Sequence, residues 1–390
     1  MGRVIPVLGW DGSPLRPRAA DRLASATLVV GGARHLAAVD VPAGARTVVM
    51  GDVATAVAEV RGHDGPAAVL ASGDPGLFGV VRTLREAGLE PEVHPALSSV
   101  QVAFARAGLP WDDAVVVSAH GRELRRAAAA CRAHPKVAVL TGPGAGPAEL
   151  SAALVGVPRR LFVAEDLSTD RECCSWLSPG EDRAWSDLTV VLSIGTGTSA
   201  RGWLAGREQP AGWALPEDAF AHRDGMITKS EVRALALARL GPRLGDLVWD
   251  IGAGSGSVGV ECARLGAAVV AVEKGPVHDL AANAAAHGVD VQVVQGSAPD
   301  VLDGLPDPDA VFVGGGGADV AAIVAACVAR GPRVVVVALA ALDRVAAVQA
   351  ALAPPYTVDG VQLSSARLRP LAGATALAAS NPVFLLWGTR

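Results

Sequence analysis

A glycine-rich segment in the second half of the chain has the composition of a ligand-binding turn. It reads Asp-Ile-Gly-Ala-Gly-Ser-Gly-Ser from Asp250 to Ser257 and continues an apolar run that starts at Leu247. Glycines in a turn from strand to helix let the backbone pass close beneath a ligand and leave amide groups free to donate hydrogen bonds. Glu273 ends the next apolar run, 21 positions after Gly252, where a carboxylate can accept both hydroxyls of a ribose. The two features together predict a cofactor that contains adenosine.

Two cofactors fit such a turn, and Asp250 distinguishes between them. A dinucleotide-binding turn usually has hydrophobic residues up to its first glycine, whereas here a carboxylate stands two positions before Gly252. A carboxylate suits the positively charged amino and sulfonium groups of S-adenosyl-L-methionine and would repel a pyrophosphate. We therefore expect S-adenosyl-L-methionine and treat an NAD-dependent oxidoreductase as the alternative. No Gly-Lys-Ser or Gly-Lys-Thr follows the turn, which excludes a P-loop.

Further segments of this half could contribute to the same site. Gln295 to Pro299 and Asp309 to Gly317 each contain small residues after an apolar run, which leave room for an adenine ring or line the crevice of an open α/β sheet. Upstream, Thr228 lies three residues before Glu231, which is the spacing of a helix capping box. We expect Thr228 to cap a helix there, and a second role at the cofactor stays open.

The first half has several polar turns that follow apolar runs. Ser-Gly-Asp-Pro-Gly from Ser72 can wrap a small polar ligand, and the Ser-Ser pair from Ser98 can cap a helix or donate hydrogen bonds. A His-Gly-Arg segment ends at Arg122, and Thr141 begins a Thr-Gly-Pro-Gly turn. By themselves these segments fit ordinary turns and caps as well as they fit a site.

The second half resembles the CbiT-type precorrin methyltransferases of cobalamin biosynthesis. The block from Met226 to Lys274 contains Met-Ile-Thr-Lys-Ser-Glu-Val-Arg, then Asp-Ile-Gly-Ala-Gly-Ser-Gly-Ser-Val, then Ala-Val-Glu-Lys, and Val-Gly-Gly-Gly-Gly from Val313 continues the match. The resemblance implies that the following residues bind S-adenosyl-L-methionine: Thr228, Asp250, Gly252, Gly254, Gly256, Ser257, Glu273, Lys274, Gly296, Ser297, Ala298, Gly314 and Gly315.

The turns of the first half resemble, in their order, those of the CbiE-type tetrapyrrole methylases, whose two α/β lobes hold S-adenosyl-L-methionine in a cleft between them. One departure lies after the first apolar run, where only Gly9 and Gly12 remain of the glycine-rich loop usual in that family. The first domain could therefore be a binding module without catalysis. The resemblance implies cofactor contacts from Gly73, Asp74, Gly76, Ser98, Ser99 and Thr141.

A chain that joins both types resembles the CobL-type fusions, the decarboxylating precorrin-6Y C(5,15)-methyltransferases. This resemblance implies methylation of a precorrin at carbons 5 and 15, loss of carbon dioxide from the ring C acetate to give precorrin-8, one S-adenosyl-L-methionine per domain, and a homo-oligomer. Because such a substrate carries many carboxylates, we expect Arg122 and Arg233 to bind it. His120 either takes part in substrate binding and proton transfer or packs in a turn. No residue is singled out as catalytic.

Composition excludes several other classes of protein. The net charge is −5 and only 4% of residues are aromatic, so no basic stripe or stacking surface for nucleic acid is expected, and an RNA methyltransferase is disfavoured. The five cysteines and eight histidines show no metal-ligand spacing, which predicts no metal site. We expect reduced thiols, no secretion signal, no membrane span and a cytoplasmic protein.

The elements that must position these turns alternate between strands and helices, which predicts an α/β fold in both halves. Two prolines and a glycine without periodicity predict a linker over residues 207–221, between a two-lobed tetrapyrrole methylase domain (1–206) and a Rossmann-like class I methyltransferase domain (222–390). In the second domain, apolar runs predict seven strands: Leu247 to Ile251, Ala268 to Glu273, Val291 to Gln295, Ala310 to Gly314, Arg333 to Leu339, Asp359 to Arg367, and Pro382 to Trp387.

Overall fold

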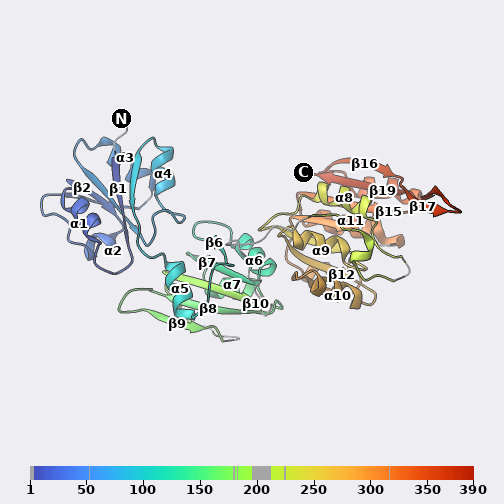
Figure 1. Ribbon diagram of the computed structural model, residues 1–390, viewed down its shortest axis with the longest axis horizontal. Helices are drawn as coiled ribbons and strands as arrows, with labels where there is room; N and C mark the ends of the chain where they lie inside the picture. Colours follow the sequence, from blue (N-terminus) through green and yellow to red (C-terminus); the bar gives the residue numbers. More distant parts are fainter. Residues whose placement is uncertain are drawn as a thin grey trace.

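The computed structural model of the chain describes residues 4–51, 53–178, 181, 183–195, 212–223, 225–315 and 317–390. Within these residues the strands form three α/β sheets and one separate two-stranded ribbon. Figure 1 shows the three sheets one after another along the long axis of the molecule, in the order of the chain. Among the described residues, no helix is both long enough and apolar enough to cross a membrane.

The first lobe is a parallel sheet in the order β3-β2-β4-β1-β5. Its inner strand β2 is buried along its whole length, because helices cover both faces of the sheet. The strands are β1 (Val4–Trp10), β2 (Leu28–Gly31), β3 (Arg46–Val49), β4 (Ala67–Ser72) and β5 (Glu90–His94), and the helices are α1 (Pro17–Ala24), α2 (Ala33–Ala38), α3 (Val53–Gly62) and α4 (Val81–Glu86).

The second lobe is a mixed sheet in the order β6-β7-β10-β8-β9. Only the pair β6–β7 is parallel among the described strands of this sheet, so the lobe differs in topology from the first. The strands are β6 (Val115–Ser118), β7 (Lys136–Leu140), β8 (Arg159–Glu165), β9 (Cys173–Trp176) and β10 (Thr189–Gly195), and the helices are α5 (Ser99–Ala107), α6 (Leu124–Ala133) and α7 (Pro147–Ala153).

The second half of the chain forms a sheet whose described strands number seven, in the order β13-β12-β11-β14-β15-β19-β16. The strands from β13 to β15 are parallel, whereas β19 runs in the opposite direction and pairs antiparallel with both β15 and β16. The strands are β11 (Leu247–Ile251), β12 (Ala268–Glu273), β13 (Gln292–Gln295), β14 (Ala310–Val313), β15 (Val334–Leu339), β16 (Thr357–Leu363) and β19 (Val383–Thr389). The helices are α8 (Ser230–Leu240), α9 (Ser257–Arg264), α10 (His278–Ala286), α11 (Val320–Ala329) and α12 (Val345–Leu352), with the short 3-10 turns η1 (Glu217–Ala219), η2 (Leu302–Gly304), η3 (Gly317–Asp319) and η4 (Leu342–Arg344).

This strand order has a switch point between β11 and β14. The chain leaves β11 toward β12 and β13 on one side and later returns to β14 on the other side. Open α/β sheets bind ligands at the carboxyl ends of the strands at such a point. The glycine segments that follow β11 and β14 therefore face the same crevice.

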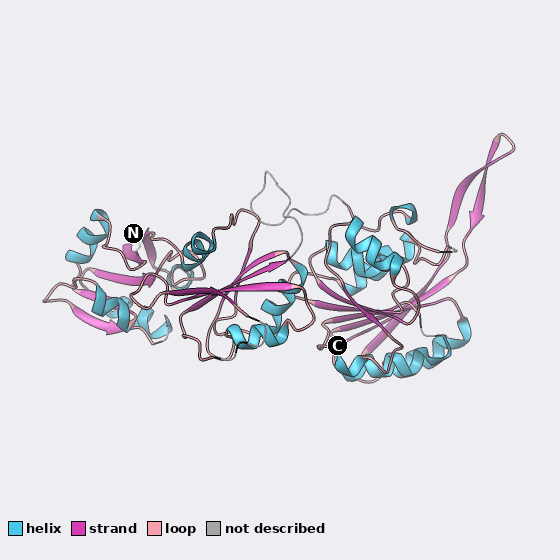
Figure 2. Ribbon diagram, turned by 90° about the horizontal axis from the view of Figure 1, so that it is seen from below, coloured by secondary structure: helices cyan, strands magenta, loops and turns pink. Residues whose placement is uncertain are grey.

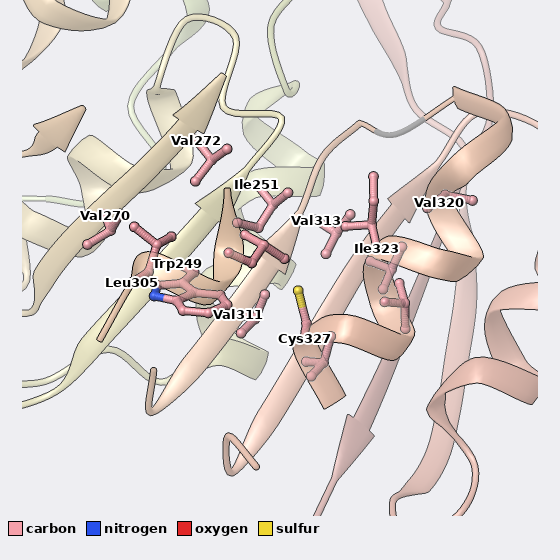
Figure 3. Packing of buried hydrophobic residues seen from close by; sticks show 14 of the residues in the cluster. Trp249, Ile251, Val270, Val272, Leu305, Val311, Val313, Val320, Ile323 and Cys327 are labelled. Carbon is pink, nitrogen blue, oxygen red and sulfur yellow. The ribbon is translucent and has the colours of Figure 1, made fainter. Parts of the chain in front are cut away.

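The central strands of this sheet carry apolar residues on both faces. Trp249 of β11 is fully buried and donates its indole N–H to the carbonyl of Pro306 at 3.1 Å. Figure 3 shows it beside Val311 of β14, with Cys327 of α11 over the same layer. A continuous apolar run such as β15 thus encodes a strand that is covered from both sides.

The α/β class and the seven-stranded sheet of the described second half confirm the prediction, but the ends of the chain differ from it. Two terminal strands were expected between Asp359 and Trp387, and the structure has four, because β17 (Ala366–Leu371) and β18 (Ala374–Ala379) form the separate ribbon. Figure 2 shows this ribbon projecting from the body of the second half. Its side chains are mostly exposed, so it lacks the buried apolar run on which the prediction relied.

Two edge strands of the first half, β5 and β9, lack the continuous apolar run that marks a strand in the sequence. β5 carries Glu90, Pro91 and Glu92, and β9 contains the Cys173-Cys174 pair. Each lies at the end of its sheet and is only partly buried. Edge strands need less apolar surface than central ones, so the hydrophobic pattern does not reveal them.

Part of the predicted linker packs against the second domain. Residues 207–211 lie outside the described residues, but Phe220 is 3% exposed and belongs to the core beside α9 and α10. The backbone N–H of Leu215 donates to Glu261 at 2.7 Å, and that of Ala221 donates to Asn283 at the same distance. We therefore assign residues 215–221 to the second domain.

Helix α6 of the second lobe lies against the second domain. Arg125 pairs with Asp309 at 2.7 Å, and Ala129 is buried in the same apolar cluster as Leu247. Asp309 also accepts the backbone N–H of Leu247, which places this contact at the amino ends of β11 and β14. The contact is therefore at the opposite end of the sheet from the glycine segments.

Arg367 attaches the ribbon to the body of the domain. Its guanidinium donates to Glu217 at 2.6 Å and to Glu231 at 2.9 Å, and it also reaches the hydroxyl of Ser230. The hydrogen bond from Arg367 holds the pKa of the Glu217 carboxyl at about 2. Arg367 therefore has a structural role at the base of the ribbon.

Replacing Arg367 by Ala is expected to lower the free energy of unfolding by about 1 kcal/mol or less at neutral pH, because the ion pairs are partly exposed. The pKa of Glu217 is depressed from 4.5, so the stabilisation is present above pH 4.5 and is lost as the pH falls toward 2. Urea unfolding at several pH values measures this difference. Arg369→Ala on the same strand is the control. If the difference in unfolding free energy between Arg367→Ala and the wild type widens in acid, the ion pairs of Arg367 do not stabilise the fold as described.

Candidate functional site

The glycine segments after β11 and β14 touch each other through their backbones. Gly252 has φ +69°, and a Cβ at this position would lie 2.9 Å from the nitrogen of Gly315. Gly256 has φ +73°, and its Cβ would lie 2.7 Å from the side chain of Leu280. At Gly254, with φ +55°, nothing lies within 4 Å of an added Cβ. The turn is thus closely packed on two sides and open at Gly254.

Glu273 is held at the edge of this opening by backbone hydrogen bonds. The N–H of Gly254 donates to one carboxylate oxygen and the N–H of Gly275 to the other, each at 2.8 Å. A carboxylate has about four acceptor positions, so both oxygens keep the capacity to accept a hydroxyl. The position and remaining capacity of Glu273 fit the two hydroxyls of a ribose.

Asp250 lies beneath the turn and is 1% exposed. The N–H of Gly259 in α9 donates to its Oδ2 at 2.7 Å, whereas its Oδ1 has no hydrogen-bond partner among the described residues. Burial raises the pKa of Asp250 to about 7. The hydrogen bond from Gly259 lowers this pKa, and the negative charge of Glu273 raises it. A buried, unpaired carboxylate oxygen favours a positively charged neighbour.

The other predicted residues of this half differ in their surroundings. Ser257 is buried at the start of α9, whereas Lys274 and Ser297 are exposed after β12 and β13. Gly296 is required by packing, since a Cβ there would overlap the side chain of Val301. Gly314 approaches the ring of Phe312, at 2.8 Å from an added Cβ. The structure therefore gathers the strand-end glycines at one crevice and leaves Lys274 and Ser297 at its exposed rim.

The predicted capping box at Thr228 is wrong. Helix α8 begins at Ser230, and its N-cap residue is Lys229, whose side chain makes no capping hydrogen bond. Glu231 pairs instead with Arg367 of the ribbon. The competing long-range ion pair determines where the Glu231 side chain lies.

The prediction that Arg233 binds the substrate is also wrong. Arg233 is completely buried; its guanidinium donates to the carbonyls of Thr228 and Leu215 and lies 3.5 Å from Glu261. The ring of Phe220 covers it at 4.8 Å. Arg233 therefore holds the backbone of Leu215 and Thr228 onto the domain. The local sequence pattern does not distinguish such a buried arginine from one on the surface.

The first half contains a cavity of about 650 Å³ lined by both lobes. The walls include the carboxyl ends of β1 and β4 in the first lobe and the ends of β6, β7 and β10 in the second. Of the predicted residues, those that line it are Gly73, Asp74, Ser98, Ser99, His120, Arg122 and Thr141. Gly76 is not among the lining residues and donates its N–H to Asp74 at 2.8 Å.

Several of these residues make hydrogen bonds within the fold. The Ser98 hydroxyl accepts the N–H of Gln101 at 3.2 Å and so caps α5. Thr141 is 7% exposed, and its hydroxyl donates to the carbonyl of Thr189 at 2.6 Å. Nδ1 of His120 lies 3.3 Å from the carbonyl oxygen of Thr141. Among the predicted residues that line the cavity, Ser99 and Arg122 have exposed side chains. Within the described residues, neither side chain makes a hydrogen bond of this kind.

The first turn of the chain is shaped by glycine packing. A Cβ on Gly9 would overlap the carbonyl oxygen of Gly73, and Gly73 itself has φ +55° against the backbone of Leu97. A Cβ on Gly12 would overlap the carbonyl oxygen of Ser168 in the second lobe. The two glycines that remain in this shortened loop are thus required for close backbone contacts around the cavity.

Sequence reasoning missed other residues that line the cavity. Arg34 and His35 follow β2, and Phe78 lies in the turn after Gly73 with φ +51° and 46% exposure. The guanidinium of Arg122 lies 5.4 Å from the Phe78 ring, across the two lobes. The sequence contains one signal for Arg34 and His35: the Gly31-Gly32 pair follows an apolar run, as the glycine turns at Gly73 and Gly252 do.

Comparison with known proteins gives consistent matches in both halves. A model of tetrapyrrole (corrin/porphyrin) methylases matches residues 13–174, and a model of a precorrin methyltransferase domain matches residues 218–390. The precorrin-6Y C(5,15)-methyltransferase [decarboxylating] of Sinorhizobium sp is 37% identical over 330 residues, 80% of this chain and 78% of the relative.

Two shorter relatives match about half of the chain each. The probable cobalt-precorrin-6B C(15)-methyltransferase (decarboxylating) of Pyrobaculum calidifontis is 37% identical over 186 residues, 44% of this chain and 93% of the relative. The cobalt-precorrin-7 C(5)-methyltransferase of Salmonella typhimurium is 33% identical over 186 residues, 46% of this chain and 92% of the relative.

Replacing Gly9 by Ala is expected to destabilise the first lobe by about 1–3 kcal/mol, because the added methyl group overlaps the Gly73 carbonyl. Gly44→Ala is the matched control, since nothing lies within 4 Å of its added Cβ, and it should change stability by less than about 0.5 kcal/mol. Chemical unfolding of the three chains measures the difference. Equal midpoints for Gly9→Ala and the wild type would contradict the packing argument.

Proposed function

The chain belongs to the family of decarboxylating precorrin-6Y C(5,15)-methyltransferases, and on that premise we propose its activity. It transfers methyl groups from S-adenosyl-L-methionine to carbons 5 and 15 of a precorrin and removes carbon dioxide from the ring C acetate, which gives precorrin-8 in cobalamin biosynthesis. The first half methylates carbon 5, and the second half methylates carbon 15 and decarboxylates. The cytoplasmic location and the homo-oligomer stay predictions.

One observation supports this assignment above the others: the chain has two separate candidate sites. The inter-lobe cavity is lined by residues up to Val190, and the glycine crevice is built from residues after Leu247. Each half also matches its own family model. Two methyl transfers in one chain need two places where a cofactor and a substrate carbon meet, and this arrangement supplies both.

The crevice of the second half fits S-adenosyl-L-methionine. This cofactor would supply an electrophilic methyl group on a positively charged sulfur. Glu273 would accept the ribose hydroxyls, the open face at Gly254 would admit the nucleoside, and the buried Oδ1 of Asp250 would favour the positive charge. Gly314 and Gly315 would leave room beside the reacting group, because no side chain projects there.

The work of the protein in such a reaction is mainly alignment. Methyl transfer is an in-line displacement, so rate depends on holding the donor and the acceptor carbon at the right distance and angle and on excluding water. Packed glycine turns give a rigid base for that alignment. In decarboxylation the electron pair of the broken bond passes into the conjugated macrocycle, and a proton replaces the lost carbon dioxide.

In the first half, Ser99 and Arg122 are the predicted residues whose exposed side chains face the cavity. Arg122 would bind a carboxylate of the macrocycle, and its contact with Phe78 would hold the guanidinium at the cavity wall. Gly73 and Asp74, at the end of β4, would lie against the cofactor.

Titration of S-adenosylhomocysteine into the purified chain is expected to show two sites. Gly254→Trp should remove the site of the second half, because its side chain enters the open face of the turn, and Ser99→Trp should remove the site of the first half. The double variant should bind none. Gly288→Trp is the matched control, since it also combines positive φ with open surroundings but lies outside both sites.

One site in the wild type that Gly254→Trp removes would contradict the two-methylation proposal. The first half would then be a binding module for the macrocycle, and only the second half would be a methyltransferase. Unchanged stoichiometry in both Trp variants would place the cofactor elsewhere in the chain.

Cofactor binding in the second half is expected to release protons near neutral pH. Since the pKa of Asp250 is about 7, a positive charge brought next to it lowers that pKa and releases up to about half a proton at about pH 7. Calorimetry of S-adenosyl-L-methionine binding in two buffers of different ionisation enthalpy measures the release. Asp250→Asn should abolish it, and an equal release from this variant would show that another group titrates.

A further inference from the structure

Asn283 of α10 hydrogen-bonds to two backbone segments that are distant in the sequence. Its Oδ1 accepts the backbone N–H of Ala221 at 2.7 Å, and its Nδ2 donates to the carbonyl of Ala221 at 2.8 Å. Nδ2 also donates to the carbonyl of Ser255 at 2.8 Å. Ala221 ends the segment 215–221 that leads into the second domain, which we call the docking segment, and Ser255 belongs to the glycine turn 252–256.

The three hydrogen bonds determine how the Asn283 amide is oriented. An asparagine side chain has two N–H donors and one carbonyl oxygen, and here each of the three has a backbone partner. Turning the amide over would place Nδ2 against the N–H of Ala221 and the oxygen against two carbonyl oxygens. Because Asn283 is 2% exposed, that arrangement would leave buried polar groups unsatisfied. The backbone of Ala221 thus directs one N–H of Asn283 at Ser255.

The peptide unit between Ser255 and Gly256 is held at both ends. Its carbonyl accepts from Asn283, and its N–H donates to the carbonyl of Ala253 at 2.8 Å. Gly256, with φ +73°, is also the N-cap residue of α9. This peptide follows the open position at Gly254, so its direction sets where the open face of the turn lies relative to α9.

A second residue of α10 holds the docking segment without reaching the glycine turn. Nε2 of His287, one helical turn after Asn283, lies 2.9 Å from the carbonyl oxygen of Ala219, and its ring packs on Phe220. Within the described residues, His287 makes no hydrogen bond to residues 252–256. The two side chains therefore separate the attachment of the docking segment from the orientation of the turn.

We propose that Asn283 is a positioning residue for the cofactor of the second half, which holds the glycine turn in its binding conformation through the Ser255 carbonyl. The proposal rests on the function proposed above and deepens it. With Asn283 in place, the Ser255–Gly256 peptide has one orientation before the cofactor arrives, so binding does not have to order the turn. Without the Nδ2–H, the Ser255 carbonyl loses its donor and the peptide is free to rotate, which costs affinity and the alignment of the methyl donor.

The first test is titration of S-adenosylhomocysteine into the full chain. Asn283→Ala should weaken binding in the second half by about tenfold, as expected for the loss of a buried hydrogen bond. Asn283→Asp should weaken it at least as much, because it keeps the size of the side chain and an acceptor for Ala221 but has no N–H for Ser255. Binding in the first half of the same chain should be unchanged and serves as the internal control.

His287→Ala is the matched control variant, since His287 holds the same docking segment from the same helix. It should change the affinity of the second half by less than about twofold. In carbon 15 methylation, Asn283→Ala should raise the KM for S-adenosyl-L-methionine and leave the KM for the precorrin unchanged. Carbon 5 methylation by the same chain should not change.

Hydrogen exchange of the backbone amides, measured without cofactor, separates positioning from general destabilisation. In Asn283→Ala, exchange should be faster at residues 252–257 and unchanged in the central strands β11 and β14. In His287→Ala, exchange at residues 252–257 should stay at the wild-type rate.

Three results would overturn the role of Asn283. These are unchanged exchange of the turn in Asn283→Ala, unchanged affinity for S-adenosylhomocysteine in that variant, and an equal loss of affinity in His287→Ala. A wild type whose second half binds no S-adenosylhomocysteine would overturn this role together with the proposed function. A second half that binds S-adenosylhomocysteine through an Asn283-dependent turn but methylates no precorrin would overturn the proposed function alone.

Discussion

Both candidate sites depend on direct backbone contact between turns that follow parallel strands. In the second half, Gly252 after β11 meets Gly315 after β14; in the first half, Gly9 near the end of β1 meets Gly73 after β4. A side chain at Gly252, Gly9 or Gly73 would overlap the neighbouring backbone and force these segments apart. Because the carboxyl ends of parallel strands lie on one edge of a sheet, the same constraint creates the crevice and brings polar groups such as Glu273 and Asp74 to it.

The arrangement of the halves separates the two sites. Helix α6 of the second lobe contacts the second domain at the amino ends of β11 and β14, through the Arg125–Asp309 pair and the buried Ala129. The glycine crevice is at the other end of the same strands. Within the described residues the sites therefore share no wall, and a substrate that is modified twice has to leave one site before it enters the other.

Charged residues in this protein have roles that their sequence neighbours do not indicate. Arg233 is buried against Glu261 and supports the segment that leads into the second domain, whereas Arg367 attaches the exposed ribbon through Glu217. Arg34, which no motif marked, lies at the cavity beside a buried histidine. For Arg233 and Arg367 the deciding factor is a partner from a distant segment of the chain, and Arg34 likewise donates to Ser72 of β4.

The sequence alone determined the class of fold, the glycine turns and the family. Continuous apolar runs such as Val334–Leu339 predict buried parallel strands. Glycine turns can be recognised in the sequence because their backbone requirement is local. Edge strands such as β5, the ribbon of β17 and β18, and the partners of Arg233 and Arg367 were decided only by the tertiary structure. These features depend on burial and on partners from distant segments, and neither quantity is contained in the local pattern of residues.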